Sequence, residues 1–254
     1  MTEKKFQLNT GAEIPAVGLG TWQSAPGEVK KAVAYALKTG YRHVDCAFCY
    51  ANEDEVGEGL QTAFDTGNDI RFPKKLDGSR DLVLSWSHLQ TWKQMEALVN
   101  TGKTRAIGVC NYSVRYLKEL LQVATIVPAV NQIENHPYLP QNDIVKFCKG
   151  KGIHITAYSP LGSTGSPLAN DPAIQALALR YEVPQSTILL SYHGARGSSV
   201  LAKSVTLSRI EQNKLTIDLA KADIAILEGI HEKSGALRYV YPPFGVDFGF
   251  PDKP

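Results

Sequence analysis

The segment VDCAFCY pairs a carboxylate, Asp45, with a phenol, Tyr50, five residues further along the chain. The ordinary pKa of a tyrosine hydroxyl is about 10, so a tyrosine serves as a general acid only where a cation or a hydrogen-bond partner lowers that pKa. A neighbouring carboxylate can then orient the cation. Taken singly, Asp45 is better explained as a structural carboxylate at a strand end, and Tyr50 as a half-buried aromatic residue.

Three further segments offer groups that recognise an amide and a pyrophosphate. Asn111 in IGVCNYS and Gln132 in VNQIENHPY each carry a carboxamide, which suits another amide such as that of nicotinamide. Tyr158 in ITAYSPLGS offers a ring face for stacking. The hydroxyls and flexible backbone of Ser159–Ser163 could wrap a pyrophosphate. Taken singly, Asn111, Gln132 and Tyr158 are better explained as satisfied polar residues at strand ends.

The segment LAKSVTLSRIEQN contains the strongest electrostatic signal in the chain. Lys203 and Ser204 close a predicted strand, Thr206 can cap the helix that follows, and Arg209 lies in its first turn. Two cations at a helix N-terminus form an anion site. They fit a phosphate monoester, such as the 2′-phosphate of NADP, better than an unphosphorylated ribose, for which an acidic partner is usual. The alternative is a basic helix start that is simply solvated.

The elements that must position these residues alternate between short strands and helices. The segment KFQLNTGAEIPAVGLG predicts a hairpin around Thr10-Gly11 and a strand that ends near Gly20. A helix is expected from Val29 until Gly40 stops it, then a strand over 41–47 and a helix from Asn52. Later helices are expected over 91–100, 114–123, 141–149, 172–181, 184–195, 207–213 and 221–234, and later strands over 105–109, 127–133, 153–158 and 200–204.

This alternation predicts a parallel sheet covered by helices, which is the α/β class. More than five such units, with no GxGxxG after the first strand, favour a (β/α)8 TIM barrel over a doubly wound open sheet. In such a barrel the working groups lie at the carboxyl ends of the strands. Asp45, Asn111, Gln132, Tyr158 and Lys203 are all expected at such ends.

Residues 66–90 interrupt the pattern. They read TGNDIRFPKKLDGSRDLVLSWSHLQ, a polar stretch rich in turn residues whose single strand candidate is 82–86. About six strands are recognisable, whereas a closed barrel of this type needs eight. We therefore expect one barrel domain over residues 1–254, with an irregular segment at 66–90 and without the third and fourth strand units.

The amino-acid composition limits which classes of partner and site are expected. The 254 residues carry 27 Lys plus Arg against 25 Asp plus Glu, so no strong net field favours nucleic acid or an anionic membrane as a partner. Four Cys and a start without an apolar signal segment predict a cytoplasmic protein, and no apolar run is long enough to span a membrane. Cys46-x-x-Cys49 has no second pair and the six His show no ligand spacing, so no metal is expected.

Taken together, several motifs resemble the aldo-keto reductases, and they occur in the same order as in that family. They are GLGTWQ, DCAFCYANEDEVGEGL, TGKTRAIGVCNYS, VPAVNQIENHPYLPQ, HITAYSPLGS and AKSVTLSRIEQN. The ending RYVYPPFGVDFGFPDKP resembles the branch of fungal glycerol dehydrogenases and related xylose and aldehyde reductases. The resemblance covers residues 5–64 and about 72–254.

The resemblance implies a barrel that binds NADP(H) across its carboxyl-terminal rim and reduces carbonyls by hydride transfer. It implies that Asp45 is the catalytic carboxylate and Tyr50 the proton donor, while Trp22 and Phe48 border the substrate. Cys110 stands where the family usually has Ser. The cofactor residues implied are Thr21, Asn111, Gln132, Tyr158, Ser159, Leu161, Ser163, Lys203, Ser204, Val205, Thr206, Arg209, Gln212 and Asn213.

Two catalytic residues of the family have no counterpart. Its Lys at the end of the third strand and its His at the end of the fourth should fall between Phe64 and Phe72, where the sequence reads DTGNDIR. This indicates an internal deletion near Gly67-Asn68 of about 50 residues. Tyr50 then lacks the ammonium that lowers its pKa, and Asp45 lacks its ion-pair partner. Lys74 and Lys75 lie in a loop flanked by Pro and Gly and are poor substitutes.

We therefore expect an NADP(H)-dependent carbonyl reductase or polyol dehydrogenase, a monomer or weak homodimer, with impaired activity on small aldehydes, ketones or polyols. One alternative is a non-catalytic truncated product that only binds NADP(H). Another is a barrel enzyme with independent chemistry in residues 66–90, which would need a new acid or base such as Asp77 or His88.

Overall fold

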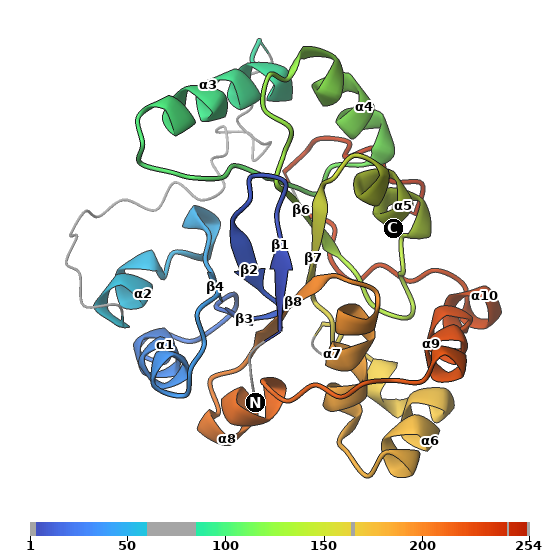
Figure 1. Ribbon diagram of the computed structural model, residues 1–254. Coiled ribbons are helices and arrows are strands. Elements are labelled where there is room, and N and C mark those ends of the chain that lie inside the picture. The colour runs from blue at the N-terminus through green and yellow to red at the C-terminus, as the bar shows by residue number, and fades with distance from the viewer. Residues whose placement is uncertain (1–3, 60–84, 164–165, 243, 253–254) are drawn as a thin grey trace, which may run out of the picture.

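Six parallel strands form the centre of the molecule (Figure 1). The computed structural model describes residues 4–59, 85–163, 166–242 and 244–252. Within them the sheet order is β4-β3-β8-β7-β6-β5, so the last strand along the chain pairs with the first. The strands are β3 (Val17–Gly20), β4 (Val44–Asp45), β5 (Val109–Cys110), β6 (Val130–Glu134), β7 (His154–Tyr158) and β8 (Ser199–Lys203).

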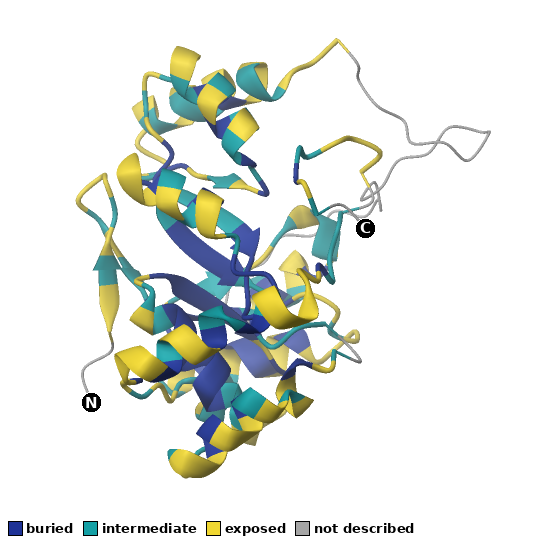
Figure 2. Cartoon of the chain, turned by 90° about the vertical axis from the view of Figure 1, so that its right-hand side faces the viewer, coloured by how far each residue is buried: buried dark blue, intermediate teal, exposed yellow. Residues whose placement is uncertain are grey.

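This order is that of a (β/α)8 barrel without the two strands that would lie between β4 and β5. The sheet curls into a half-barrel with helices on its outer side, and the buried strands lie inside exposed helix faces (Figure 2). The structure therefore confirms the expected barrel-family fold with about six strands. The predicted deletion junction and most of the strand candidate 82–86 lie outside the described residues; Ser85 and Trp86 are described and are not in a strand.

An antiparallel hairpin precedes the sheet. Strand β1 (Lys5–Gln7) pairs with β2 (Glu13–Pro15), as the alternating sequence predicts. Gly11 in the connecting turn has a φ of 79°, a conformation that glycine adopts without steric cost. The hairpin is tied to the sheet because the backbone N–H of Ala16 donates to the carbonyl of Lys4 and that of Val200 to the carbonyl of Ala16.

The helices follow the predicted order along the chain. Within the described residues none is both long enough and apolar enough to span a membrane. Their bounds are α1 (Val29–Lys38), α2 (Glu53–Gly59), α3 (His88–Asn100), α4 (Val114–Val123), α5 (Asn142–Gly150), α6 (Pro172–Arg180), α7 (Gln185–Ala195), α8 (Leu207–Asn213), α9 (Lys221–Glu228) and α10 (Ile230–Ser234), with 3-10 turns η1 (Phe48–Tyr50) and η2 (Leu168–Asn170).

Two helix predictions need correction. Helix α3 begins three residues before the predicted Thr91, because Ser87 and Gln90 form a capping box in which each side chain bonds the other's backbone N–H. The single helix expected over 221–234 is two helices, α9 and α10, separated at Gly229. Glycine is the least favourable residue other than proline in a helix interior, which suits it to this break.

The two edge strands are shorter than predicted. Strand β4 covers two of the residues 41–47, and β5 extends over Val109–Cys110 instead of 105–109. Among the described residues each pairs on one side only, β4 with β3 and β5 with β6. A strand with one partner has half the ladder hydrogen bonds to hold it extended. The strands are therefore shortest on both sides of the gap.

Buried aliphatic side chains hold the helices on the sheet. Leu19 on β3 and Val200 and Ala202 on β8 pack against Ala32 and Val33 of α1 in one cluster. Helix α7 is buried on most of its surface, from Thr187 to His193. Gly18 of β3 has no room for a side chain, since a Cβ there would lie 2.6 Å from the Leu201 side chain and 2.8 Å from the His43 ring. These contacts fix the register that aligns the strand ends.

Candidate active site

The carboxyl ends of the parallel strands bring the predicted polar residues to one edge of the sheet. In the strand register Gly20 lies opposite both Asp45 and Lys203, and Cys110 lies opposite Gln132. Glu134 lies opposite Tyr158. Residues from β3, β4, β5, β6, β7 and β8 thus meet although some of them, such as Gly20 and Lys203, are far apart in sequence.

Asp45 is the last residue of the edge strand β4 and has two neutral donors on its carboxylate. The Tyr50 hydroxyl donates to Oδ2 at 3.1 Å, and the Gln132 amide donates to Oδ1 at 3.1 Å. Thr21 donates its hydroxyl to the Asp45 carbonyl at 2.8 Å, and buried Asn52 donates to the Thr21 carbonyl at 2.8 Å. This chain of bonds fixes the backbone that carries the carboxylate.

Burial makes this pair weakly acidic. Loss of solvent raises the pKa of the Asp45 carboxyl, and the hydrogen bonds from Gln132 and Tyr50 offset only part of that rise. Burial, and next the Asp45 charge, raise the pKa of the Tyr50 hydroxyl well above its ordinary value. Within the described residues no Lys or Arg forms an ion pair with Asp45. The phenol is thus held in its neutral form with its proton directed at the carboxylate.

Asn111 and Tyr158 form a second pair across β5 and β7. The Tyr158 hydroxyl donates to the Asn111 Oδ1 at 2.9 Å, and burial raises the pKa of Tyr158. Asn111 and Ser159, each the residue after a strand, have φ of 59° and 50°. This left-handed turn ends the strict alternation of side chains, so that Cys110 and Asn111, although consecutive, both line the same cavity.

The cavity at this edge has a volume of about 610 Å³. Two amide atoms in it form no hydrogen bond within the described part of the chain: the Asn111 Nδ2, a donor, and the Gln132 Oε1, an acceptor. One donor and one acceptor complement a primary carboxamide such as that of nicotinamide. The sequence-predicted residues that line the cavity are Trp22, Asp45, Tyr50, Asn111, Gln132, Tyr158, Ser159, Leu161, Ser163 and Lys203.

The cationic end of the cavity is open to solvent. Lys203 is the last residue of β8, and its ammonium donates to the Gln23 carbonyl at 3.1 Å. Arg209 is exposed on α8. Thr206 occupies the N-cap position of α8 but does not cap it with its side chain; instead its backbone N–H donates to the Ser204 hydroxyl at 3.1 Å. The expected cap is therefore wrong, while the two cations remain available to an anion.

Several other predicted residues do not line the cavity. Thr21 is buried beneath it and supports Asp45. Phe48 is 65% exposed, away from the cavity wall. No group of three or more His, Cys, Asp or Glu among the described residues could hold a metal ion. The residues of the α8 region that lie outside the wall are Ser204, Val205, Thr206, Arg209, Gln212 and Asn213.

Sequence reasoning missed one wall of the cavity. Tyr239, Val240, Tyr241, Pro242 and Phe244 come from the C-terminal segment and line it. That segment has neither a helical nor a strand period, so nothing in its pattern could place it. Gln23 and Asn52 were also missed; their contacts are to backbone carbonyls, which a motif search does not reveal.

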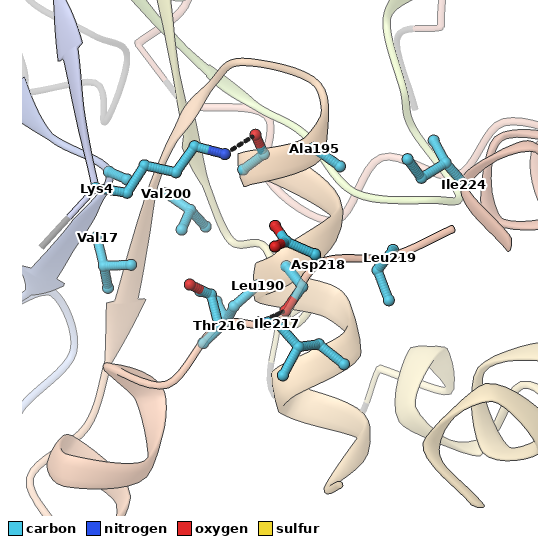
Figure 3. A pocket seen from close by; sticks show the side chains of 13 residues that line it. Lys4, Val17, Leu190, Ala195, Val200, Thr216, Ile217, Asp218, Leu219 and Ile224 are labelled. Carbon is cyan, nitrogen blue, oxygen red and sulfur yellow. Dashed lines mark hydrogen bonds between the residues drawn. The ribbon is translucent and has the colours of Figure 1, made fainter. Parts of the chain in front are cut away.

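A second cavity of about 260 Å³ lies away from this edge, between the N-terminal hairpin and helix α7 (Figure 3). Its walls combine aliphatic residues, among them Val17, Leu190 and Val200, with the polar residues Lys4, Ser191, Thr216 and Asp218. The Lys4 ammonium closes one side by donating to the Gly194 carbonyl at 2.9 Å. It contains none of the predicted site residues.

The sequence matches the family model described as Aldo/keto reductase family in two pieces, residues 16–81 and 80–232. It is 48% identical to a D-galacturonate reductase of Hypocrea jecorina, with all of both chains covered. It is 38% identical to a glycerol 2-dehydrogenase (NADP(+)) of Saccharomyces cerevisiae, with 96% of each covered. An aldose reductase structure from Schistosoma japonicum superposes with a TM-score of 0.79 at 30% identity, covering 94% of this chain and 99% of that one.

The alignment with the Hypocrea jecorina protein measures the difference in length. It extends over 308 positions and takes in the whole chain of 254 residues, so at least 54 positions have a residue in the relative and none here. This agrees with the deletion of about 50 residues expected from the missing motifs. The Saccharomyces cerevisiae alignment, 301 positions over 96% of this chain, leads to the same conclusion.

Proposed function

The chain belongs to the aldo/keto reductase family, and from that premise we propose that it binds NADP(H) and is a strongly impaired carbonyl reductase. One observation carries the proposal. The Tyr50 hydroxyl is 3.1 Å from the Asp45 carboxylate in a cavity that also contains an amide donor and acceptor, on Asn111 and Gln132. A proton donor and a carboxamide site in one cavity are what hydride transfer from a nicotinamide to a carbonyl requires.

In the proposed reaction NADPH supplies the hydride, and this chain holds its carboxamide and protonates the product. Asn111 and Gln132 hold the carboxamide, and the Tyr158 ring limits how the nicotinamide lies. The Tyr50 hydroxyl gives its proton to the carbonyl oxygen as that oxygen becomes an alcohol. Lys203 and Arg209 take the adenosine phosphate, and Ser159, Leu161 and Ser163 line the pyrophosphate.

The proposed impairment follows from the surroundings of Tyr50. Its proton is bonded to Asp45, no described cation lowers its pKa, and burial raises that pKa. The residues Phe64–Phe72, Lys74, Lys75 and Asp77 lie outside the described part of the chain. Loss of a single donor to a developing oxyanion costs about 100- to 1,000-fold in rate, so we propose turnover reduced by at least that factor relative to an intact relative.

Small sugar-derived carbonyl compounds and polyols are the proposed substrates. The support is the names of two relatives, a D-galacturonate reductase and a glycerol 2-dehydrogenase (NADP(+)). Binding of NADP(H) without turnover is the second candidate function, favoured by the absence of a described cation beside Asp45. Independent chemistry at His88 gains no support, because that ring contacts Glu119 at 3.4 Å on the α3–α4 surface. Cytoplasmic location and a monomer or weak homodimer stay predictions from the sequence.

The cofactor part of the proposal is tested by fluorescence titration of NADPH and NADH into the wild type, Lys203→Met and Lys221→Met. Lys221 is a matched control, an exposed lysine at the start of α9. Lys203→Met should weaken NADPH binding by about tenfold or more, the size of a lost bond to a charged group, and leave NADH binding unchanged. Absence of NADPH binding, or equal loss for both nucleotides, would contradict the proposal.

A further inference from the structure

Glu134, the last residue of β6, has a side chain that is 0% exposed. It is two residues past Gln132, whose side chain bonds Asp45, so it lies at the cavity edge of the sheet. A carboxylate this deeply buried must be matched by hydrogen-bond donors or positive charge. Two of its hydrogen-bond donors and one nearby guanidinium belong to the C-terminal strap, residues 238–242 and 244–252.

Two consecutive backbone N–H groups of the strap donate hydrogen bonds to the Glu134 side chain. Tyr239 donates to Oε1 at 2.7 Å and Val240 donates to Oε2 at 2.9 Å. The His136 Nε2 lies 3.0 Å from Oε1, and the Arg238 guanidinium lies 3.9 Å from Oε2. Because Oε1 is a carboxylate oxygen, His136 must present an N–H at Nε2. Each oxygen therefore accepts from the strap.

Arg238 extends the attachment to the end of the strap. Its Nε and Nη2 donate to the two Asp252 carboxylate oxygens at 2.9 and 3.0 Å, and its guanidinium lies 4.1 Å from the centre of the Phe250 ring. Nη2 also donates to the Gln141 Oε1 at 3.0 Å. Gln141 in turn donates to the main-chain carbonyl of Glu134. Further along, the strap also contacts α4, where the Tyr116 hydroxyl donates to the Asp247 carbonyl at 2.6 Å, and Phe250 packs in the core cluster with Leu117 and Ile144.

The strap forms one wall of the candidate active site. Tyr239, Val240, Tyr241, Pro242 and Phe244 line the cavity that contains Asp45 and Tyr50. Tyr239 and Val240, whose backbone N–H groups donate to Glu134, are themselves part of that wall. The position of the aromatic side chains Tyr239, Tyr241 and Phe244, and so the room left for a substrate, depends on where Glu134 holds the backbone.

We propose that Glu134 is a positioning residue that sets the width of the carbonyl site by fixing the strap. The proposal deepens the proposed function and, for its substrate part, rests on it. It says that selectivity between small and bulky carbonyl compounds depends on a carboxylate that lies outside the cavity. Glu134→Gln keeps the shape of the side chain but turns one acceptor into a donor facing a backbone N–H, so it should loosen the wall without emptying it.

The experiment compares wild type with Glu134→Gln, Arg238→Lys and Glu96→Gln. Glu96 is a matched control on α3, because its carboxylate also accepts two consecutive backbone N–H groups, from Thr125 at 2.7 Å and Ile126 at 2.8 Å, away from the cavity. Hydrogen exchange is followed in residues 238–242 and in β7. Calorimetry with the NADP⁺-saturated protein gives the dissociation constants of glyceraldehyde and 4-nitrobenzaldehyde, a measurement that needs no turnover.

Glu134→Gln and Arg238→Lys should speed exchange in the strap by about tenfold or more and leave β7 unchanged. Both variants should also bring the dissociation constants of glyceraldehyde and 4-nitrobenzaldehyde closer together, with the ratio of the larger to the smaller reduced by at least about fivefold. Glu96→Gln should change hydrogen exchange only near residues 125–126. Uniformly faster exchange in strap and β7, or an unchanged aldehyde ratio with a loosened strap, overturns the proposal. Failure of the wild type to bind NADP⁺ would count against the proposed function alone, since the exchange result still decides whether Glu134 holds the strap.

Discussion

The behaviour of Tyr50 depends on what stands beside it. Its hydroxyl donates to Asp45, a carboxylate whose other partner is the neutral Gln132 amide. Burial raises the pKa values of both groups. At Asp45 the hydrogen bonds from Gln132 and Tyr50 and the charge of His43 offset only part of that rise, and among the described residues no Lys or Arg forms an ion pair with the carboxylate. In this setting the phenol can still protonate an alkoxide, but the phenolate that alcohol oxidation needs is scarce. The two directions of the reaction should therefore differ in their response to pH.

We expect polyol oxidation with NADP⁺ to rise by about tenfold per pH unit from about pH 7 to pH 9. The sign follows from the raised pKa of Tyr50, because the phenolate fraction grows with pH until that pKa is reached. Aldehyde reduction, which uses the phenol, should stay nearly constant. Initial rates at fixed ionic strength measure both, with Tyr50→Phe as the control that abolishes the slope. A plateau in oxidation below about pH 8 would show a Tyr50 pKa lowered well below its ordinary value of about 10 and would contradict the prediction.

Most residues of the cavity could be predicted because strand ends are visible in the sequence. Asp45 and Tyr158 end their strands, whereas Gln132 lies two residues before the end of β6, opposite the last residue of β5; the parallel register brings them together. The hydrogen-bond partner of each polar side chain, however, could not be predicted from the sequence. Gln132 bonds Asp45, a residue 87 positions away, and Glu134 bonds a segment more than 100 positions away. These choices depend on tertiary packing, which no local pattern encodes.

The strands β4 and β5 show how pairing decides the length of an element. Both are two residues long, and both were predicted longer from their apolar pattern. The apolar sequence pattern indicates which residues are buried, whereas a β-strand also needs a neighbouring strand to accept and donate its backbone hydrogen bonds. Among the described residues β4 and β5 each have one such neighbour. By contrast α4 and α8 match their predicted bounds, because a helix satisfies its own backbone.

Hydrogen exchange should therefore differ along the sheet. We expect the amides of 44–45 and 109–111 to exchange at least about 100-fold faster than those of 155–157 and 200–202, since edge strands open without breaking the core. Exchange measured by mass spectrometry with fragments that separate β4, β5, β7 and β8 provides the comparison. Equal protection in the edge and central strands would mean that the edges are covered.

A partly buried histidine, His154, joins β7 to β8 at the opposite end of the sheet. The His154 Nε2 accepts from the Ser199 backbone N–H at 3.2 Å and lies 2.9 Å from its hydroxyl. Burial, and next the nearby His43, lower the pKa of His154 to about 4. An acceptor at Nε2 must be unprotonated, so this bond belongs to the neutral ring.

Stability should fall as the pH drops through this range. Below about pH 6.5 the unfolded chain gains a proton on His154 that the folded chain refuses until about pH 4, so the free energy of unfolding decreases between these values. The loss from about pH 7 to pH 5 is at most about 2 kcal/mol from this group. Urea unfolding at several pH values measures it, and His154→Gln should flatten the dependence. Identical slopes for the variant and the wild type would assign the pH dependence to other groups.

For the molecule as a whole, the gap in the described sheet lies between β4, which carries Asp45, and β5. Strands β5, β6, β7 and β8, which carry Asn111, Gln132, Tyr158 and Lys203, remain joined in order and connect through β3 to β4. The open side of the sheet lies beside Asp45, where the two absent strands would stand. This chain has at least 54 fewer residues than its alignment with a relative has positions. It retains the strands of the proposed nucleotide site, and the gap in the described sheet lies beside the proposed acid.

The ordinary size of the chain conceals this loss, and the count of strands reveals it. Six strands could be recognised from sequence, and the described sheet has six. The order in which they pair, with the gap between β4 and β5, follows from the closure of the last strand on the first. How the chain crosses from β4 to β5 falls on residues outside the described ranges, and no periodicity in 66–90 predicts it.

The central claim, cofactor binding with impaired turnover, is tested most directly on one folded sample titrated with NADPH and then supplied with glyceraldehyde. The D-galacturonate reductase of Hypocrea jecorina, treated in the same way, is the reference. We expect saturable NADPH binding by both proteins and a rate of NADPH oxidation at least about 100-fold lower for this chain. A rate within about tenfold of the reference, or the absence of saturable NADPH binding, would contradict the account.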